Sequence, residues 1–582
     1  MMIKIQRRPR ADLSLLPDTI HPILKRIYIN RGIQSINQLE TTTKALCSYK
    51  ELPGIHKAVR LLFLAIQENK RIIVVGDFDV DGATSSALSV LALRMLGSRN
   101  VDYLIPNRFK DGYGLSVQVV DQAIKLGADI IMTVDNGISS IDGVSYANKK
   151  GLQVLITDHH LPGHRLPNVD AIVNPNICSS GVFLKTLSGV GVVFYLMMAL
   201  CVYMRDKDWF ILNNMLEPKL MKFLDLVAFG TIADVVPLDK NNRILVYQGL
   251  QRIRAGKTRP GIQALIEVAN LNRKNLVASD FGFALGPRIN AAGRLHDMSF
   301  GVELLISDDI HTARYIAKQL NALNQTRKKI EENMRKEAIA FCNKIQLNKN
   351  SQFPFGLVLY QRGWHQGIIG ILASRMKEKF HRPVVVFSNN AKGILKGSCR
   401  SIPGFHFFNV LDNINSQNPG LIIMYGGHSM AAGLTLKEEH LDNFAKIFDQ
   451  AVRKELGDLA LKNIILSDGK LKEKDFSIHT AKLLKFASPW GEGFPEPVFD
   501  GKFKVINQKL VGKKHIRLLL EPIFKDCFNR TIIDGIMFNA DLNYWPNSSV
   551  KFVQLVYRLD VNEFSGSHSL QLIIEHIETI VF

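Results

Sequence analysis

The sequence predicts an α/β protein: a parallel-sheet domain joined by a long helix to a second α/β domain, then an OB-like C-terminal β-barrel. Three observations carry this prediction. From about residue 55, apolar strand-like runs alternate with helical patterns. Residues 300–347 are helical in pattern, rich in charge and free of proline or glycine after Gly301. From about residue 495 the pattern changes to strands with a period of two, as in small barrels.

A chain of 582 residues is too long for one ordinary domain. The composition shifts indicate five segments: a helical preface (1–54), the first α/β domain (55–299), a linker helix (300–347), a second α/β domain (348–458) and the barrel (459–582).

In the first α/β domain, short apolar runs predict strands at 72–75, 101–106, 130–134, 153–156 and 171–173. Helical patterns lie between them, at 56–69, 83–96, 116–126 and 140–149. Strands alternating with helices are typical of a mostly parallel sheet, whose ligands bind outside the carboxyl ends of the strands.

Three aspartates follow the first of these strands at alternate positions, Asp77, Asp79 and Asp81. In an extended chain such side chains point the same way and repel one another unless a cation lies between them. Hard divalent ions such as Mg²⁺ or Mn²⁺ prefer these oxygen ligands. A solvated Asp-rich loop is the alternative interpretation.

Further acidic and imidazole groups end other apolar elements. Asp135 follows the strand at 130–134, Asp158, His159 and His160 follow the strand at 153–156, and Asp234 follows a helix at 222–233. We expect these side chains to converge, although Asp234 alone reads as an ordinary carboxylate at a helix end. Carboxylates and histidines without cysteine suit two Mn²⁺ or Mg²⁺ ions, with Asp135 between them, and such sites hydrolyse phosphoesters. A histidine that is not a ligand can contact the phosphoryl group or transfer a proton.

The formal net charge of +20 favours a polyanionic partner, nucleic acid first and an anionic membrane surface second. The six cysteines, Cys47, Cys178, Cys201, Cys342, Cys399 and Cys527, are scattered and form no C-x-x-C pair. The basic first ten residues lack a following apolar region, so we expect no signal peptide and a cytoplasmic location. Residues 186–204 carry no charge and are long enough to cross a membrane. We interpret them as a buried helix, because a span would separate the halves of one acidic site.

Basic and aromatic residues indicate where a polyanion would bind. Arg288 and Arg294 lie among glycines at 286–294, where guanidinium forks suit phosphate, although a turn with surface arginines is the alternative. On the barrel, basic residues crowd the first two strands: Lys502, Lys504, Lys509, Lys513, Lys514 and Arg517. Phe503, Tyr544 and Trp545 are candidate stacking surfaces for single strands, or members of the barrel core.

The motifs at 77–82 (DFDVDG), 134–137 (VDNG) and 158–160 (DHH) resemble the DHH phosphoesterase superfamily, and 426–428 (GGH) resembles its associated C-terminal domain. Longer motifs at 106–115, 230–237, 286–294, 364–370 and 490–495 are similar to the bacterial single-strand-specific 5′→3′ DNA exonucleases of that superfamily. Phe78 and Val80 stand where the family usually has Tyr and Ala, and neither change affects an acidic position.

The resemblance implies a site with two Mn²⁺ or Mg²⁺ ions. Asp77 and Asp79 would hold one ion, and Asp81, His159 and Asp234 the other, with Asp135 shared. His160 would face the scissile phosphate, and the expected catalytic residues are His160, Asp135 and Asp158. DNA contacts are expected from Arg108, Arg288, Arg294, Trp364, His365, Ser398, Arg400, Gly426, Gly427 and His428 as well as Lys502, Lys504, Lys513, Lys514 and Arg517.

The implied function is digestion of single-stranded DNA from its 5′ end, releasing 5′-mononucleotides, in DNA repair and recombination. Single-strand-binding protein and a helicase are expected partners, and the expected state is a monomer that binds no membrane. Two alternatives remain: a phosphodiesterase for short oligonucleotides or cyclic dinucleotides, and a non-catalytic DNA-binding scaffold.

Overall fold

The computed structural model of the chain describes residues 3–178, 184–347, 353–390, 393–457, 463–524, 531–542, 544–563 and 568–580. Cys527 lies outside them. The chain divides into two compact units. One consists of residues 1–4, 291–297 and 319–464, and the other of residues 5–290, 298–318 and 465–582. We describe each unit by itself.

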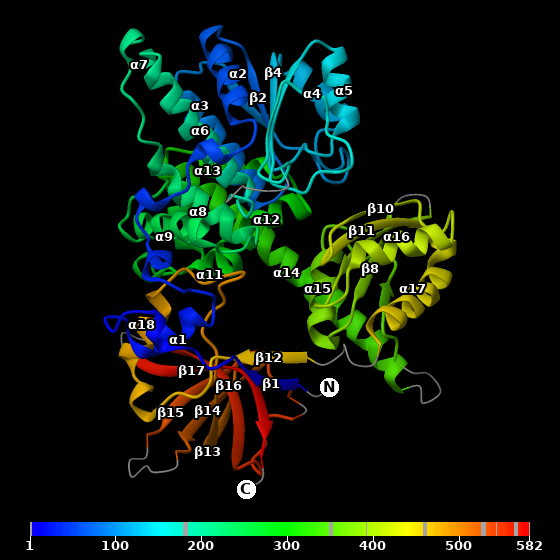
Figure 1. The fold of residues 1–582 in the computed structure, drawn as a ribbon. Coiled ribbons are helices and arrows are strands. Elements are labelled where there is room, and N and C mark those ends of the chain that lie inside the picture. Colours follow the sequence, from blue (N-terminus) through cyan, green and yellow to red (C-terminus); the bar gives the residue numbers. More distant parts are fainter. Residues whose placement is uncertain are drawn as a thin grey trace. The chain divides into compact units, whose positions relative to one another are not determined.

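The larger unit contains a five-stranded parallel sheet, as the alternating pattern predicts; its strands β2 and β4 are labelled in Figure 1. Its order is β3(Val101–Leu104), β2(Ile72–Val75), β4(Ile130–Val134), β5(Gln153–Thr157) and β6(Ala171–Val173). The chain leaves β2 toward β3 and returns to place β4 on the other side of β2. The order of strands therefore reverses between β2 and β4, which is where open α/β sheets bind their ligands.

Alternation along the strands decides which helices cover each face of this sheet. Ile73, Val75 and Ile131 face α4(Val117–Lys125) and α5(Ile141–Lys149) in one buried cluster. Strand residues of the other parity are also fully buried. Helices α2(Ile55–Gln67), α3(Val80–Met95) and α6(Gly189–Asp206) pack together in this unit. Burial on both faces explains why the strands are continuous apolar runs.

Helix α6 is the uncharged stretch that is long and apolar enough to cross a membrane. Most of it, 72%, is buried inside the structure. It packs against α2, α3 and α8(Leu224–Ala233), and residues Val192 to Met197 are completely covered. The prediction of a buried core helix is confirmed, since the apolar surface already has protein partners.

Further helices complete this part of the unit: α7(Trp209–Leu212), α9(Lys240–Arg254), α10(Pro260–Val268), α11(Ala278–Asp280), α12(Gly286–Leu295) and α13(Ser299–Ile306). The linker expected at 300–347 is two helices, because α13 ends at Ile306 and α14(Ile310–Leu347) begins after Asp309. The Asp309 carboxylate accepts hydrogen bonds from the backbone N–H (2.7 Å) and hydroxyl (2.6 Å) of Thr312. An aspartate that caps a helix in this way marks the start of a new helix. The sequence prediction missed it because no proline or glycine interrupts the segment.

The barrel belongs to the larger unit and is closed, as predicted. Its strands are β13(Phe499–Val511), β14(His515–Pro522), β15(Ile533–Met537), β17(Ser569–Thr579) and β16(Phe552–Asn562), in that order around the barrel. Helix α18(Ile478–Phe486) packs on β16. Phe503 and Trp545 are 1% and 7% exposed, so their rings fill protein interior. Of the two interpretations left open for these rings, the structure supports burial for Phe503 and Trp545, whereas the Tyr544 ring is 70% exposed.

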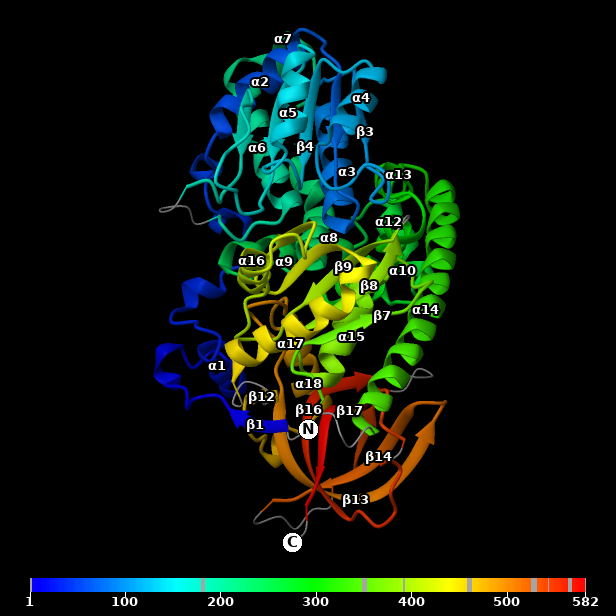
Figure 2. The same ribbon diagram turned by 90° about the vertical axis from the view of Figure 1, so that its right-hand side faces the viewer.

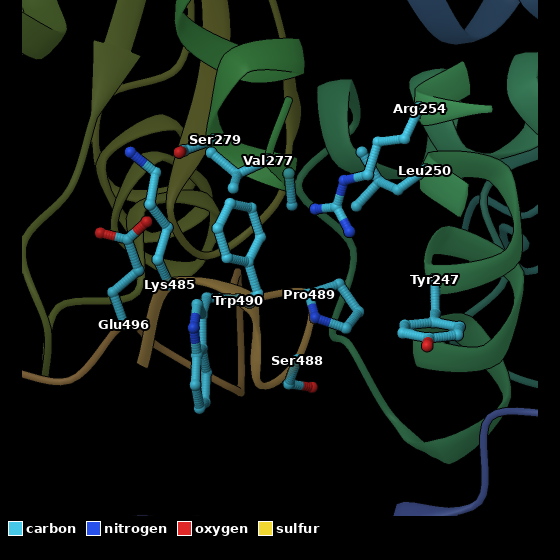
Figure 3. Close-up of a pocket in the computed structure, with 12 residues that line it drawn as sticks. Tyr247, Leu250, Arg254, Val277, Ser279, Lys485, Ser488, Pro489, Trp490 and Glu496 are labelled. Carbon is cyan, nitrogen blue, oxygen red and sulfur yellow. The ribbon is translucent and has the colours of Figure 1, made fainter. Parts of the chain in front are cut away.

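A loop around Trp490 joins the barrel to the helices beside the parallel sheet. Figure 3 shows Trp490, Pro489 and Ser488 opposite Tyr247, Leu250 and Arg254 of α9. The backbone N–H of Leu238 donates to the carbonyl of Glu492 (2.8 Å), and the Arg243 guanidinium lies 4.4 Å from the centre of the Phe494 ring. The barrel is therefore fixed to the sheet-bearing part by both polar and aromatic contacts.

The N-terminal preface reinforces this junction. It contains β1(Ile3–Arg7), α1(Pro22–Ile29) and several 3₁₀ turns, whereas the sequence predicts helices alone. Tyr28 stacks on the rings of Trp490 and Phe494, and Arg31 donates to both carboxylate oxygens of Asp468 at 2.8 and 2.9 Å. Arg31 also donates to the carbonyl of Pro495 (2.7 Å). The preface thus binds the segment that leads into the barrel.

We expect Arg31→Lys to lower the free energy of unfolding by about 1–3 kcal/mol, because lysine cannot reproduce the bidentate fork in a site where both side chains are 1% exposed. Thermal unfolding of the purified variant measures this loss. Arg7→Lys is the matched control: Arg7 also forks onto a carboxylate, that of Asp500, but is half exposed and should cost less. Equal losses for the two variants would contradict the prediction.

The smaller unit contains a mixed sheet in the order β10(Met424–Gly427), β11(Ala431–Lys437), β9(Ile394–Arg400), β8(Val384–Asn390) and β7(Leu357–Tyr360). Only β7 and β8 are parallel neighbours. Figure 2 shows α17(Leu441–Leu456), α16(Phe407–Gln417) and α15(Ile369–Phe380) with this sheet. The sheet separates two buried clusters, one with α16 and α17 and the other with α15 and α14.

Candidate metal centre and nucleic-acid contacts

The predicted acidic residues meet at the carboxyl ends of β2, β4 and β5. Asp77, Asp81, Asp135 and Asp158 are buried, and His159 is partly buried. Three sets of side chains bring their ligand atoms within 4.8 Å of one another: Asp77 with Asp79 and Asp135; Asp81 with His159 and Asp234; and Asp135 with His159 and His160. All eight predicted catalytic and metal-ligating residues thus lie in one region, Asp158 through its contact with His160.

Local backbone geometry positions each carboxylate. Asp79 caps α3, because its side chain accepts from the backbone N–H of Asp81 (2.9 Å) and of Gly82 (3.1 Å). The Asp81 carboxylate accepts from the first N–H groups of α6, at Gly189 (2.6 Å) and Val190 (3.0 Å). A helix N-terminus favours negative charge, so α6 holds Asp81 in place.

Asp135 has a left-handed backbone, with φ of +62°, directly after β4. This conformation is uncommon for residues other than glycine. Nε2 of His159 lies 3.1 Å from Oδ1 of Asp135 and 3.4 Å from Oδ2 of Asp234. Within the described part of the chain, neither of these buried carboxylate oxygens has a hydrogen-bond donor. Buried carboxylate oxygens that lack a hydrogen-bond donor and surround an imidazole nitrogen form a set of ligands that suits Mn²⁺ or Mg²⁺.

Two glycines leave room for this cluster, and the sequence reading attached no site role to either. A Cβ on Gly189 would lie 2.6 Å from the Cβ of Asp135. A Cβ on Gly230 would lie 2.7 Å from Oδ1 of Asp81. Contacts below 3 Å force displacement, so any side chain at these positions would shift the carboxylates. For Gly189, the sequence signal is a glycine at the start of an uncharged helix.

Burial of like charges raises the pKa of most of these carboxyl groups. Burial, and then the charge of Asp79, raise the pKa of Asp77 to about 8 and that of Asp81 to about 7. Burial and the neighbouring aspartates raise the pKa values of Asp135 and Asp234 well above the ordinary range. The metal-free cluster therefore holds protons near neutral pH, and a cation that binds there displaces them.

This linkage predicts a pH-dependent stabilisation by metal. Because the folded-state pKa values of Asp77 and Asp81 lie above 3.8, the stability of the metal-free protein falls as pH rises toward about 8. Metal competes with fewer protons at the higher pH. The gain in Tm on adding Mn²⁺ should therefore be several degrees larger at about pH 8 than at about pH 6. Calorimetric scans with Mn²⁺ or EDTA test this, and an equal gain at both pH values would contradict it.

His160 and Asp158 form a second arrangement beside the cluster. Nδ1 of His160 lies 2.7 Å from Oδ1 of Asp158, which also accepts from the backbone N–H of His159 and His160. The other oxygen accepts from the N–H of Ile138 (2.9 Å). Asp158 is thus occupied by hydrogen bonds and belongs to none of the three metal-capable sets. It orients the His160 ring.

The electrostatics of this pair oppose burial. Burial acts to raise the pKa of Asp158, but its hydrogen bond to His160 and the charges of both histidines bring the pKa below its ordinary value. Burial likewise acts to lower the pKa of His160, but the hydrogen bond and charge of Asp158 raise it overall. The pair therefore favours a protonated imidazole beside the cluster.

Aromatic and cationic side chains cover His160. The Tyr113 hydroxyl lies 3.4 Å from Nε2 of His160, and its ring meets that of Phe78 edge to face. The Arg108 guanidinium lies 4.1 Å from the centre of the Phe78 ring. Burial lowers the pKa of Arg108, against the charges of Asp77 and Asp79. Arg108 was predicted from the sequence as a DNA contact. Tyr113 was assigned no role, although it lies in the motif at 106–115.

The segment at 286–294 is helix α12, so the alternative interpretation of a turn with surface arginines is wrong. Arg288 donates to the carbonyls of Ala284 (2.5 Å) and Val268 (3.4 Å). Ile289, Ala291 and Ala292 are fully buried and form the apolar face of this helix. The glycines on either side make this helical pattern hard to recognise in the sequence.

Several of the other predicted DNA contacts lie in the smaller unit and gather near the start of α15. Arg294 donates to the carbonyl of Gly367 (3.2 Å), whose N–H donates to Nδ1 of His365 (3.1 Å). Arg400 donates to the Ser398 hydroxyl (3.3 Å), and both lie on one face of β9. Trp364 is 7% exposed and donates to Glu337, so its ring offers no face to a base, contrary to expectation.

The glycine motif lies on the same sheet as Ser398. Across the strands, Gly426 pairs with Gly433, and Gly433 pairs with Ser398. A Cβ on Gly426 would meet no atom within 4 Å, so backbone is open at this position. Gly427 has φ of +137°, and exposed His428 follows β10. This row can accept close approach of a ligand to the backbone.

On the barrel, the predicted basic residues are all exposed: Lys502, Lys504, Lys509, Lys513, Lys514 and Arg517. Arg517 donates to both oxygens of Asp534, at 2.7 and 2.6 Å, so an internal carboxylate already engages its fork.

Comparison with known proteins gives consistent matches along the chain. Family models match at 71–231 (DHH family, N-terminal domain), 354–454 (DHHA1 domain) and 467–576 (RecJ OB domain). The single-stranded-DNA-specific exonuclease RecJ of Dickeya dadantii is 51% identical, and that of Escherichia coli 52%, each over 99% of both chains. The crystal structure of Thermus thermophilus RecJ with Mn²⁺ is similar, with a TM-score of 0.77 and 26% identity over 100% of this chain and 80% of that one. A crystal structure of exonuclease RecJ bound to manganese matches with a TM-score of 0.57 and 33% identity, over 70% of this chain and 98% of that one.

Proposed function

The chain belongs to the RecJ family of single-stranded-DNA-specific exonucleases, and from this premise we propose that it digests single-stranded DNA from the 5′ end and releases 5′-mononucleotides. It is a metal-dependent hydrolase of the DHH family, and Mn²⁺ or Mg²⁺ is its cofactor. The observation that carries the proposal is the cluster of carboxylates and imidazole at the switch point of the sheet. The protein acts in DNA repair and recombination.

In the proposed site, Asp77 and Asp79 hold one ion, Asp81, His159 and Asp234 hold the other, and Asp135 is shared. A metal ion held there would lower the pKa of a water molecule and neutralise charge on the phosphate oxygens. The residues of the chain hold this arrangement before substrate arrives: α6 fixes Asp81, and the cap of α3 fixes Asp79. Little rearrangement is then needed when the phosphodiester binds.

His160 is the proposed group that contacts the scissile phosphate or transfers a proton to the leaving oxygen. Asp158 accepts a hydrogen bond from Nδ1 of His160, which directs Nε2 away from Asp158. A protonated imidazole in that orientation is a donor toward a phosphoryl oxygen. We assign Asp158 as a positioning residue and Asp135 as a metal ligand.

We propose that single strands are held by the basic and glycine-rich surfaces described above, with Arg108 and Arg288 in the larger unit, Arg294, His365, Ser398, Arg400, Gly426, Gly427 and His428 in the smaller one, and Lys502, Lys504, Lys513 and Lys514 on the barrel. Exposed lysines suit a backbone contact that is independent of sequence. We further propose that the chain has the five domains given above and acts as a monomer in the cytoplasm. Its proposed partners are single-strand-binding protein and a helicase.

The test uses one long single strand that carries a label at its 5′ end or at its 3′ end, incubated with Mn²⁺ or with EDTA. The expected result is immediate release of labelled mononucleotide from the 5′ end alone, and none with EDTA. Cleavage restricted to very short oligomers would support the small-substrate phosphodiesterase instead. Tight binding without product would support the non-catalytic scaffold.

A further inference from the structure

A single turn of π-helix, Phe281–Leu285, precedes α12 and exposes one aromatic ring. Phe281 is fully buried and stacks on Phe229 of α8, and Leu285 is fully buried. Phe283, between them, is 86% exposed. Phe281 and Leu285 therefore pack this segment into the protein interior, and the Phe283 ring contributes nothing to the core. Turns of this kind occur frequently at functional sites.

This π-helix lies against the two segments that carry proposed metal ligands. A Cβ on Gly286, which follows it, would lie 3.7 Å from Cγ2 of Val80, the residue between Asp79 and Asp81. The same Cβ would lie 3.9 Å from the Cβ of Ala233, the residue before Asp234. Small residues here allow close contact, so the π-helix that carries Phe283 leads directly into a segment that packs on both of these ligand-bearing stretches.

The neighbouring surface has the character of a nucleic-acid contact. Arg288 lies on the continuing helix and donates to the carbonyl of Ala284, the residue after Phe283. Val235, which follows Asp234, is 63% exposed and has φ of +61°. A branched side chain in that conformation is a strained feature that a structure retains where it serves a site. An exposed ring, an exposed apolar side chain and a guanidinium thus lie on segments next to the acidic cluster.

We propose that Phe283 is a stacking surface for a nucleobase of the single strand and holds the adjacent phosphodiester at the metal centre. The inference rests on the proposed function. Aromatic rings bind bases of any sequence because every base has a π-face. The ring therefore contributes to substrate affinity and register but takes no part in the chemical step.

The test compares wild type with Phe283→Ala on two single strands, one normal and one with abasic residues at its first few 5′ positions. On the normal strand, kcat/KM of the variant should fall about tenfold or more, mainly through KM. On the abasic strand, the variant and wild type should be equal, because the stacking partner is missing. Phe283→Trp should restore the normal rate. Leu212→Ala removes a side chain that is 77% exposed on α7 and should leave the rate unchanged.

Each outcome has one meaning. If Phe283→Ala matches wild type on the normal strand, or loses as much on the abasic strand as on the normal one, the stacking role is overturned. Failure of Phe283→Trp to restore the rate also overturns it. If wild type itself releases no nucleotide from the normal strand, the proposed function fails instead. Melting temperatures equal to wild type are expected, since the ring is exposed.

Discussion

Asp135→Ala should lose about a thousandfold or more of the exonuclease rate and keep the wild-type fold. Asp135 belongs to two of the three metal-capable sets, and its buried Oδ1 has no hydrogen-bond donor among the described residues. Both proposed ions would lose a ligand. Release of labelled mononucleotide from a long single strand with Mn²⁺ measures the effect.

The matched control is Asp142→Ala, which removes an exposed carboxylate in the first turn of the helix that follows Asp135. It should retain the wild-type rate, at a small cost in helix stability. The metal-dependent gain in Tm should disappear in Asp135→Ala and persist in Asp142→Ala. Retention of nuclease activity by Asp135→Ala would remove the basis of the ligand assignment.

Much of this site could be predicted from the sequence because its signals are local. Asp77, Asp135 and Asp158 each follow an apolar strand, and parallel strands bring their carboxyl ends to one edge. Asp234 differs, since it follows a helix and reaches the cluster only because α8 packs on α3. The assignment of Asp234 to the acidic cluster rested on the resemblance to a family, because the pattern of apolar residues does not show that the end of this helix lies at the edge of the sheet.

Residues whose role depends on packing could not be predicted in the same way. Phe503 and Trp364 look like binding aromatics in sequence, but alternation and helix packing bury both. A turn was the alternative interpretation of 286–294, yet the segment is helical. Its buried face and its close approach to α3 and α8 outweigh the low helix propensity of Gly286 and Gly293. Arg31 and Asp468 are 437 positions apart, so no local pattern links the preface to the barrel.

Asp158→Asn should lower the exonuclease rate about 100-fold or more, although Asp158 belongs to none of the metal-capable sets. One carboxylate oxygen faces Nδ1 of His160, and the other faces the N–H of Ile138. An amide can accept from only one of these positions and presents its NH₂ group to the other. The His160 ring would then lose either its orientation or the tautomer that directs a proton outward.

A double-variant experiment separates positioning from general loss of fold. If Asp158 acts through His160, Asp158→Asn combined with His160→Ala should be no slower than His160→Ala alone, because the two residues act as a unit. The Mn²⁺-dependent gain in Tm should persist in both single variants, since the proposed ligands are intact. Multiplicative losses in the double variant would show that Asp158 acts elsewhere. The pairing of Asp158 with His160 would then be only a structural hydrogen bond at the end of β5.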